Sequence, residues 1–219
     1  MLTNIAYEVK SFSPLIMHNN QSADPLNRYT KHSKPLKAKK KKTDEDHAEI
    51  SRIDWEAGLY LSNGLVGVKG EMLFSCLLAA SKRRKNGRIF PTSVSFSESF
   101  YPLTYPGLQI KAVETEEIPN PGLDKFFEGH RFVTLVRVNG STVPSTRPYF
   151  PVWSLSFSVH LDESQMERRT LDETVVDAGL FCGLGDWRPN SPKSGGQYGR
   201  FELVKSEVLD LNGHGKSRK

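Results

Sequence analysis

Apolar and polar residues alternate in two segments of the chain, and this alternation predicts half-buried β-strands. In residues 5–12, Ile5, Tyr7 and Val9 fall on one side. In residues 153–161, large apolar residues alternate strictly with serine and histidine, so that one face is bulky and the other is small and polar. Because successive side chains of a strand point to opposite faces of its sheet, both segments fit an antiparallel sheet with helices on one side only.

Apolar residues at helical spacing predict two main helices. Residues 68–85 are apolar on most sides and end in a basic turn, which complements the helix dipole. Residues 163–181 carry an apolar stripe, with Asp162 as the expected N-cap and Gly183 as the C-terminal stop. Two further strands are expected, over residues 132–138 and 200–208.

The main elements therefore follow the order strand, helix, strand, strand, helix, strand. This order predicts an α+β fold, with a ferredoxin-like (βαββαβ, RRM-like) core and an antiparallel sheet. A single domain, residues 1–219, would contain two insertions. The first, about 19–62, combines a polar, lysine-rich mobile loop over 19–42 with a helix that begins at Thr43. The second, about 89–131, consists of loops and weak β-segments.

Composition limits the class of protein. The chain has 219 residues, of which 37% are hydrophobic and 25% charged, as is ordinary for a globular protein. It has no apolar run of about 18 residues and no signal-peptide pattern at its start, so no membrane partner is expected. Its two cysteines lie far apart in apolar surroundings, which predicts reduced thiols and a cytoplasmic protein. The six histidines show no metal-ligand spacing.

The net charge of +5 is concentrated in clusters, and this changes the functional expectation. The first cluster contains Lys31, Lys34, Lys37, Lys39, Lys40, Lys41 and Lys42. The second contains Lys82, Arg83, Arg84, Lys85 and Arg88, and the third Lys216, Arg218 and Lys219. Clustered cations indicate a polyanionic partner, most often nucleic acid. The alternative for the lysine run is a solvated segment that binds nothing.

Residues 183–200, which we call the glycine loop, have glycines at both ends and separate the second helix from the last strand. The residues of interest in this loop are Gly185, Trp187, Arg188, Lys193, Tyr198 and Arg200. Glycine tolerates positive φ and lets a ligand approach the main chain closely. Main-chain N–H groups with nearby cations suit a phosphate backbone, while aromatic rings can stack on bases. The alternative is a surface loop that only connects a helix to a strand.

Two segments, Gly67–Ser75 and the glycine loop, together resemble parts of the RAMP superfamily of CRISPR-associated proteins. Gly67–Ser75 (GVKGEMLFS) resembles the small-residue start of the first helix in that superfamily, and places Lys69 before a glycine. The glycine loop resembles the RAMP glycine-rich loop in position and outline. The basic insertion after the first strand looks most like the backbone subunits of CRISPR effector complexes. The chain lacks the usual proline of the helix start and has its own Asp-Trp-Arg-Pro insertion, so a stand-alone or phage-encoded relative fits equally well.

The resemblance implies a protein that holds single-stranded RNA or DNA and forms homo-oligomers along it, or joins other CRISPR-type subunits. It also leaves open an RNA endonuclease, or a viral decoy that binds a CRISPR subunit. As a nuclease, the protein would use Asp24 with a divalent metal such as Mg²⁺, or a histidine base, for which His18, His32 and His47 are placed suitably. No other cofactor or metal is expected. An aspartate before a proline is also a common turn residue.

Arg147 lies between two prolines just before the strand at 153–161, in the sequence Pro-Ser-Thr-Arg-Pro. It could be held at the sheet edge to meet a phosphate, or it could cap a loop through hydrogen bonds. Trp187 has a similar pair of roles, since its ring could stack on a base or pack the glycine loop onto the core.

Overall fold

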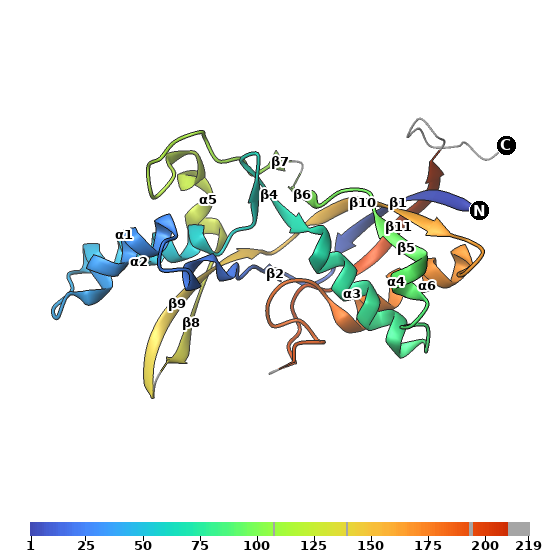
Figure 1. Ribbon diagram of the computed structural model, residues 1–219. Helices are drawn as coiled ribbons and strands as arrows, with labels where there is room; N and C mark the ends of the chain where they lie inside the picture. Colours follow the sequence, from blue (N-terminus) through green and yellow to red (C-terminus); the bar gives the residue numbers. More distant parts are fainter. Residues whose placement is uncertain (107, 139, 193–194, 210–219) are drawn as a thin grey trace.

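The computed structural model describes residues 1–106, 108–138, 140–192 and 195–209. It shows an α+β protein that extends over two lobes (Figure 1). The main sheet contains β1 (Leu2–Ser11), β3 (Leu61–Ser62), β4 (Leu65–Lys69), β5 (Val94–Phe96), β6 (Phe100–Tyr105), β7 (Leu108–Gln109), β10 (Ser154–Asp162) and β11 (Phe201–Leu209). Its strand order is β11-β1-β10-β6-β4-β3, with β5 paired to β10 and β7 to β6, and every pairing is antiparallel.

Helices lie on one face of this sheet (Figure 1). They are α3 (Gly70–Arg83), α4 (Phe90–Ser93) and α6 (Arg168–Asp177), which continues as the π-helical segment η4 (Ala178–Cys182). The strands turn their apolar residues toward these helices, and Ile5, Tyr7 and Phe157 are each at most 3% exposed. The Tyr7 hydroxyl donates to Asp172 of α6 at 2.9 Å, which ties the helix to the central strand. No helix in the described ranges is long and apolar enough to cross a bilayer.

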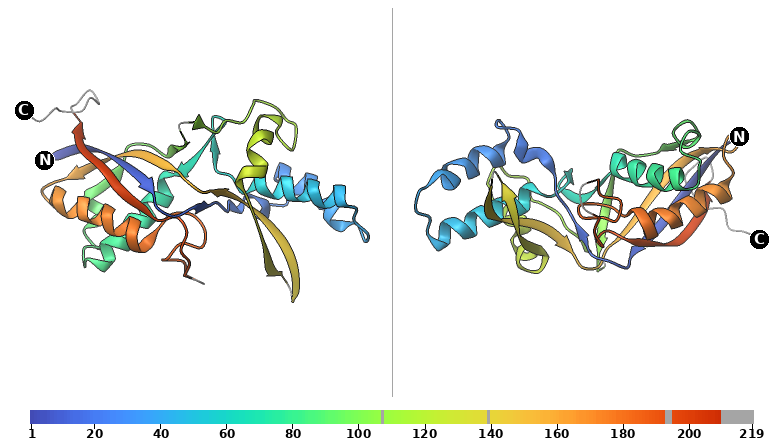
Figure 2. Two further views of the ribbon diagram at one scale, coloured as in Figure 1. Left: turned by 180° about the vertical axis from the view of Figure 1, so that it is seen from behind. Right: turned by 90° about the horizontal axis from the view of Figure 1, so that it is seen from below.

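The second lobe is built around a small sheet of order β2-β9-β8. Its elements are β2 (Leu15–Ile16), η1 (Asn20–Ala23), α1 (Arg28–Ala38), α2 (Asp44–Ala57), η2 (Pro121–Leu123), α5 (Asp124–Phe127), η3 (Glu128–His130), β8 (Arg131–Val138) and β9 (Ser141–Phe150). Trp55 of α2 is fully buried and donates its indole N–H to the His130 carbonyl at 2.7 Å. The β8–β9 hairpin projects beyond the body of the lobe (Figure 2).

Local signals located most helix ends correctly. The predicted helix start at Thr43 is confirmed, since its side chain accepts from the Asp46 N–H at 3.3 Å while the Asp46 carboxylate accepts from the Thr43 N–H at 3.0 Å. The predicted N-cap at Asp162 is wrong. Its carboxylate accepts from the N–H of Ser164 at 3.0 Å, forming a turn, and α6 begins only at Arg168. An aspartate that forms such a turn competes with helix initiation.

The prediction of a mobile loop over residues 19–42 is wrong, because most of this segment forms η1 and α1. Helix α1 tolerates Pro35 and packs against α2, with Tyr29 only 3% exposed. The Tyr29 hydroxyl donates to the fully buried Glu56 carboxylate at 3.0 Å. Contacts with α2 therefore stabilise a helix that a lysine-rich segment containing proline would not form alone.

The strand expected over residues 132–138 exists as β8, but it pairs with β9 in the small sheet. Beside β10, on the side opposite β1, the neighbouring strands are β5 and β6. These two strands lie in the segment 89–131, which the sequence pattern assigns to an insertion. Both are short, and β6 contains Pro102. Alternation thus predicts that a segment forms a strand, without predicting which sheet the strand joins.

The glycine loop contacts the connection between the two lobes through its main chain. The Gly199 N–H donates to the Pro14 carbonyl at 2.7 Å, and the Asp186 N–H donates to the Ile16 carbonyl at 2.8 Å. Gly185 and Gly199 have φ of +73° and +70°. A Cβ on Gly185 would overlap the Ile16 carbonyl, and one on Gly199 would overlap a loop carbonyl. Both glycines are therefore required for the close approach of the loop.

We expect Gly199→Ala to lower the free energy of unfolding by about 2–4 kcal/mol, since positive φ costs about 1 kcal/mol and overpacking costs about 1–3 kcal/mol. Gly140→Ala is the matched control. Gly140 has φ of +83° but no atom within 4 Å of an added Cβ, so a loss of only about 1 kcal/mol is expected. Urea unfolding followed by circular dichroism measures both. Equal losses would show that the loop does not need this close approach.

Candidate nucleic-acid interface

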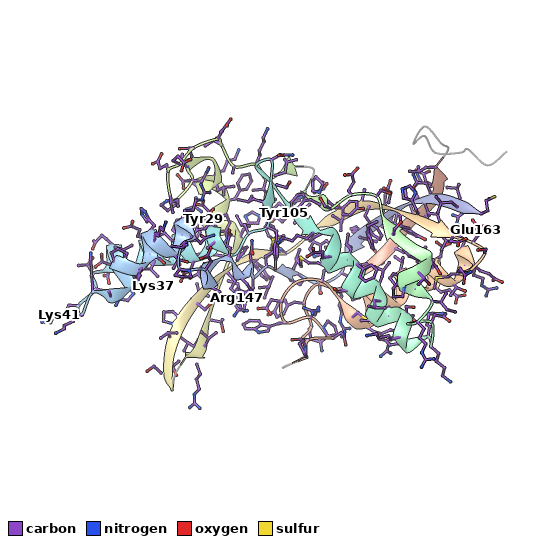
Figure 3. The ribbon with its side chains drawn as sticks, in the orientation of Figure 1. Tyr29, Lys37, Lys41, Tyr105, Arg147 and Glu163 are labelled. Carbon is purple, nitrogen blue, oxygen red and sulfur yellow. The ribbon has the colours of Figure 1, made fainter. Side chains whose placement is uncertain are left out.

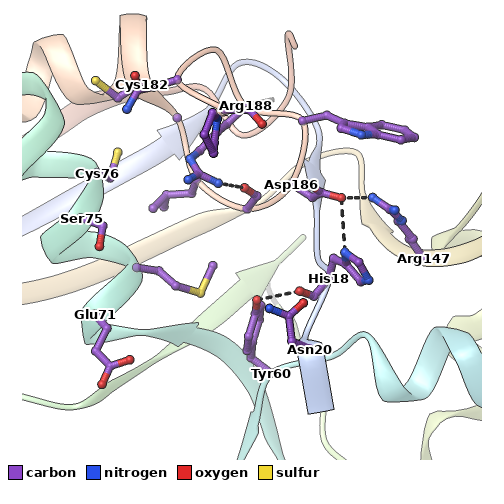
Figure 4. A pocket seen from close by; sticks show the side chains of 18 residues that line it. His18, Asn20, Tyr60, Glu71, Ser75, Cys76, Arg147, Cys182, Asp186 and Arg188 are labelled. Atoms are coloured by element: carbon purple, nitrogen blue, oxygen red, sulfur yellow. Dashed lines mark hydrogen bonds and ion pairs between the residues drawn. The ribbon is translucent and has the colours of Figure 1, made fainter. Parts of the chain in front are cut away.

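A pocket of about 750 Å³ lies where the glycine loop faces α3 and the segment after β2 (Figure 4). We call it the junction pocket. Five residues singled out from the sequence line it: His18, Arg147, Gly185, Trp187 and Arg188. Helix α3 contributes Glu71, Ser75 and Cys76 to the opposite wall. The volume of the junction pocket is within the usual range of sites for small molecules or single groups of a larger ligand, about 300–1,000 Å³.

Asp186 organises the charged side of the pocket. Its main-chain bond to Ile16 holds it in place, and its carboxylate forms an ion pair with Arg147. The same carboxylate oxygen lies 3.7 Å from Nδ1 of His18 (Figure 4). The guanidinium carbon of Arg147 lies 4.8 Å from the centre of the Trp187 ring, a cation–π arrangement. Strand β9 thus places Arg147 against the glycine loop, where both of these side-chain contacts are with loop residues.

Burial changes the ionisation of two of these groups. It lowers the pKa of Arg147, which is 9% exposed, but an arginine starts so high that the side chain stays charged. Burial and then the nearby Arg147 cation lower the pKa of His18 below its ordinary value. His18 is therefore neutral at pH 7 and can accept a proton or a hydrogen bond. Within the described ranges, no group of three or more His, Cys, Asp or Glu side chains could hold a metal ion.

The glycine loop is held in a fixed shape around Arg188. The guanidinium of Arg188 donates to the Gly185 carbonyl at 2.7 Å. The main-chain carbonyl of Arg188 accepts from the Gly196 N–H at 3.1 Å. Trp187 has φ of +49°, which is uncommon for a residue other than glycine. Such conformations persist where surrounding contacts enforce them, and they occur often at functional sites.

Four half-buried rings join the glycine loop to the β8–β9 hairpin, and we call them the aromatic cluster: Phe132, Tyr149, Trp187 and Tyr198. Phe132 lies at the centre, with ring centroids 5.6 Å from Trp187, 5.8 Å from Tyr149 and 5.9 Å from Tyr198. Trp187 therefore packs against the second lobe while part of its ring stays exposed. Both roles considered for Trp187 are compatible with this geometry.

Lys69 does not line the junction pocket but contacts Tyr60, which does. Its ammonium is 5.6 Å from the centre of the Tyr60 ring, and the Tyr60 hydroxyl donates to the His18 carbonyl at 3.0 Å. Sequence patterns did not single out Tyr60, Asp186, Phe132 or Tyr149. Of these four, Phe132 lies in a segment predicted to be a strand, and that prediction does not identify a partner.

The first basic cluster, which includes Lys37 and Lys41, lies outside the junction pocket. It extends to the end of the second lobe that is far from Arg147 (Figure 3). Two of its members are partly neutralised by α2, because Lys37 pairs with Asp54 at 2.7 Å and Lys39 with Asp46 at 2.5 Å. The Lys42 ammonium donates to a carbonyl of the same turn at 2.8 Å. Lys40 and Lys41 are exposed.

The second basic cluster also lies outside the junction pocket. Arg84 pairs with Asp177 at 2.6 Å and with Glu173 at 2.5 Å, so it ties α3 to α6. The guanidinium carbon of Arg83 lies 4.6 Å from the centre of the Phe181 ring, and Lys82 is exposed.

The remaining predicted residues have separate positions. The Arg200 N–H donates to the Ser13 hydroxyl at 2.8 Å, and its side chain does not line the pocket. Asp24 is exposed, and its carboxylate accepts from the Leu26 N–H at 2.8 Å, which is the geometry of a turn residue. Lys193 lies outside the described residues.

We expect Arg147→Gln to raise the pKa of His18, because it removes a nearby cation and leaves the Asp186 carboxylate facing the imidazole. NMR titration of the His18 ring protons measures this, with His18→Gln identifying the resonance. Arg131→Gln is the control, since Arg131 pairs with Glu128 at 2.8 Å and should leave His18 unchanged. A His18 pKa that is the same with and without Arg147 would contradict this account of the pocket.

Neither a known family model nor a curated protein sequence matches this chain. The resemblance of Gly67–Ser75 and of the glycine loop to RAMP proteins therefore stays a prediction from the sequence. The site is defined by its own groups: Arg188, Arg147 paired with Asp186, the Glu71 carboxylate on the opposite wall, a neutral imidazole, glycine main chain and partly buried rings. These groups favour a ligand that combines negative charge with aromatic surface.

Proposed function

We propose that the protein binds single-stranded nucleic acid, RNA or DNA, in the cytoplasm, as a RAMP-type protein that oligomerises along the strand. One observation carries the binding proposal: Arg188 and Arg147, the latter paired with Asp186, both line the junction pocket beside the partly buried rings of the aromatic cluster. Arginine pairs with phosphate through its planar fork of donors. Exposed rings stack on bases regardless of sequence, which suits a strand whose bases are not paired.

The same proposal includes a ferredoxin-like core. The strand order β11-β1-β10 followed by β5 and β6, with α3 and α6 on one face, supports it. The opposite face carries Ser154, Ser156 and Ser158 from β10, and Glu8 and Lys10 from β1. RNA-recognition domains stack bases on aromatic residues of this open face. These positions of the open face offer small and charged side chains instead of aromatic ones. We therefore propose that the nucleic-acid strand binds on the side of the glycine loop.

A second candidate is cleavage of RNA without a metal, favoured by one observation. His18 is neutral at pH 7 and shares the junction pocket with Arg147 and Arg188. A neutral imidazole can act as a base, and a guanidinium can stabilise charge on a phosphate. Incubation of labelled RNA in EDTA, with wild type and His18→Ala, tests it. The turn geometry of Asp24 lends no support to cleavage with Mg²⁺.

Arg188→Ala should weaken binding of a fluorescein-labelled single-stranded oligonucleotide about tenfold or more, as loss of a charge-assisted hydrogen bond predicts. It should also reduce the slope of log K against log salt by about 0.7. Fluorescence anisotropy at several salt concentrations measures both. Arg169→Ala is the control, because this arginine of α6 has an 86% exposed side chain and pairs with Glu173. If Arg188→Ala binds as wild type does, or if wild type binds no strand, the proposal fails and a protein-interaction decoy becomes the better description.

Lys40→Glu combined with Lys41→Glu should weaken binding of a long strand, about 30 nucleotides, and spare a short one of about 8 nucleotides. The reason is that this end of the molecule lies far from the junction pocket (Figure 3). Competition anisotropy with both strands measures the difference. Lys10→Glu with Lys205→Glu makes the same charge change on the open face of the sheet and should have the smaller effect. Equal losses for both strand lengths would contradict an extended binding path.

A further inference from the structure

The π-helical segment η4, which continues helix α6, reverses the usual distribution of large and small residues. Ala178 and Gly179 face the protein interior, whereas the adjacent Leu180 and Phe181 are 39% and 47% exposed. Val176, one turn earlier, is 39% exposed. Single exposed apolar residues are normal, but a contiguous group of large ones marks an interaction surface.

The packing of η4 against β11 explains this reversal. A Cβ on Gly179 would overlap the main chain of Phe201, so this turn lies directly on the strand. The Gly183 N–H donates to the Ala178 carbonyl at 2.8 Å, five residues back, which widens the turn into a π-helix. Small residues are required on the inner side, and the wide turn presents two large apolar side chains to solvent. Folding alone requires only the small residues, since the outer positions could be polar.

The charge around these apolar residues is positive. Arg83 of α3 lies over the Phe181 ring at 4.6 Å, and Lys82 beside it is exposed. The acids of α6 that face α3 are already paired, because Asp177 and Glu173 both contact Arg84. Lys85 and Arg88 add further exposed cations at the end of α3.

We propose that this surface binds an acidic amphipathic segment of a partner protein. We call it the basic apolar patch, composed of Lys82, Arg83, Val176, Leu180 and Phe181. Apolar side chains of the partner would cover the three apolar residues, and its carboxylates would pair with Arg83 and Lys82. A nucleic acid would use the cations, but it has no aliphatic surface to match valine and leucine. The patch is separate from the junction pocket, so the proposal does not depend on strand binding.

The probe is a synthetic fluorescein-labelled helix of about 16 residues, with Leu at i, i+4, i+7 and i+11 and Glu at the flanking positions. A second peptide has the same composition in scrambled order. We expect the amphipathic peptide to bind by anisotropy, and Leu180→Ser, Phe181→Ser and Arg83→Glu each to weaken it about tenfold. Val204→Ser is the matched control, because Val204 is 59% exposed on β11 and should have no effect. All of these side chains are exposed or partly exposed, and thermal unfolding verifies that each variant is folded.

Three outcomes would overturn the proposal. The amphipathic peptide does not bind, or the scrambled peptide binds equally well, which would indicate charge attraction alone. Alternatively, the serine variants bind the peptide as wild type does. Oligonucleotide anisotropy on the same variants provides the separate comparison: if Phe181→Ser weakens strand binding as much as Arg188→Ala does, the patch belongs to a nucleic-acid interface instead.

Discussion

The main-chain contact between the glycine loop and the chain after β1 is the constraint on which the site depends. Two hydrogen bonds, to the carbonyls of Pro14 and Ile16, join a loop near the C-terminal end to the connection between the lobes. Only glycine at positions 185 and 199 allows this approach. The contact places Asp186 opposite Arg147 of the second lobe, so one loop contributes to the junction pocket and also packs the two lobes together.

For predicting which cations can bind an anion, the position of a cation in the fold is therefore more informative than the number of cations in a sequence segment. Lys37, Lys39 and Arg84 come from the densest basic runs of the sequence, yet each is paired with a carboxylate of a neighbouring helix. Arg147 and Arg188 stand alone in the sequence and both line the junction pocket, where Arg147 is paired with Asp186 and Arg188 forms no ion pair with another described residue. Exposed ion pairs contribute little to stability, commonly under about 1 kcal/mol, but they reduce the charge that a polyanion can use. Affinity for an anion should therefore depend on few residues.

Most parts of the fold that depend on neighbouring residues were predictable, with the N-cap expected at Asp162 as an exception, and those that depend on distant residues were not. The capping box at Thr43 and the alternation in β10 are local signals, and both agree with the structure. Helix α1 needs the buried contact of Tyr29 with α2, which no pattern around Pro35 reveals. For the site, glycine content predicted the loop and its arginine. The pairing of Asp186 with Arg147, 39 positions earlier, depends on the tertiary fold, so the sequence singled out Arg147 but not its partner.

Helix α3 connects the two surfaces for which binding is proposed. It has 14 residues and is therefore about 21 Å long. Glu71 near its start lines the junction pocket, whereas Arg83 at its end belongs to the basic apolar patch. A partner segment held at the patch would thus lie within about one helix length of a strand held at the pocket. Because the helix is packed on the sheet along its length, the two ligands would keep a fixed separation, which a protein that positions a strand for a second protein requires.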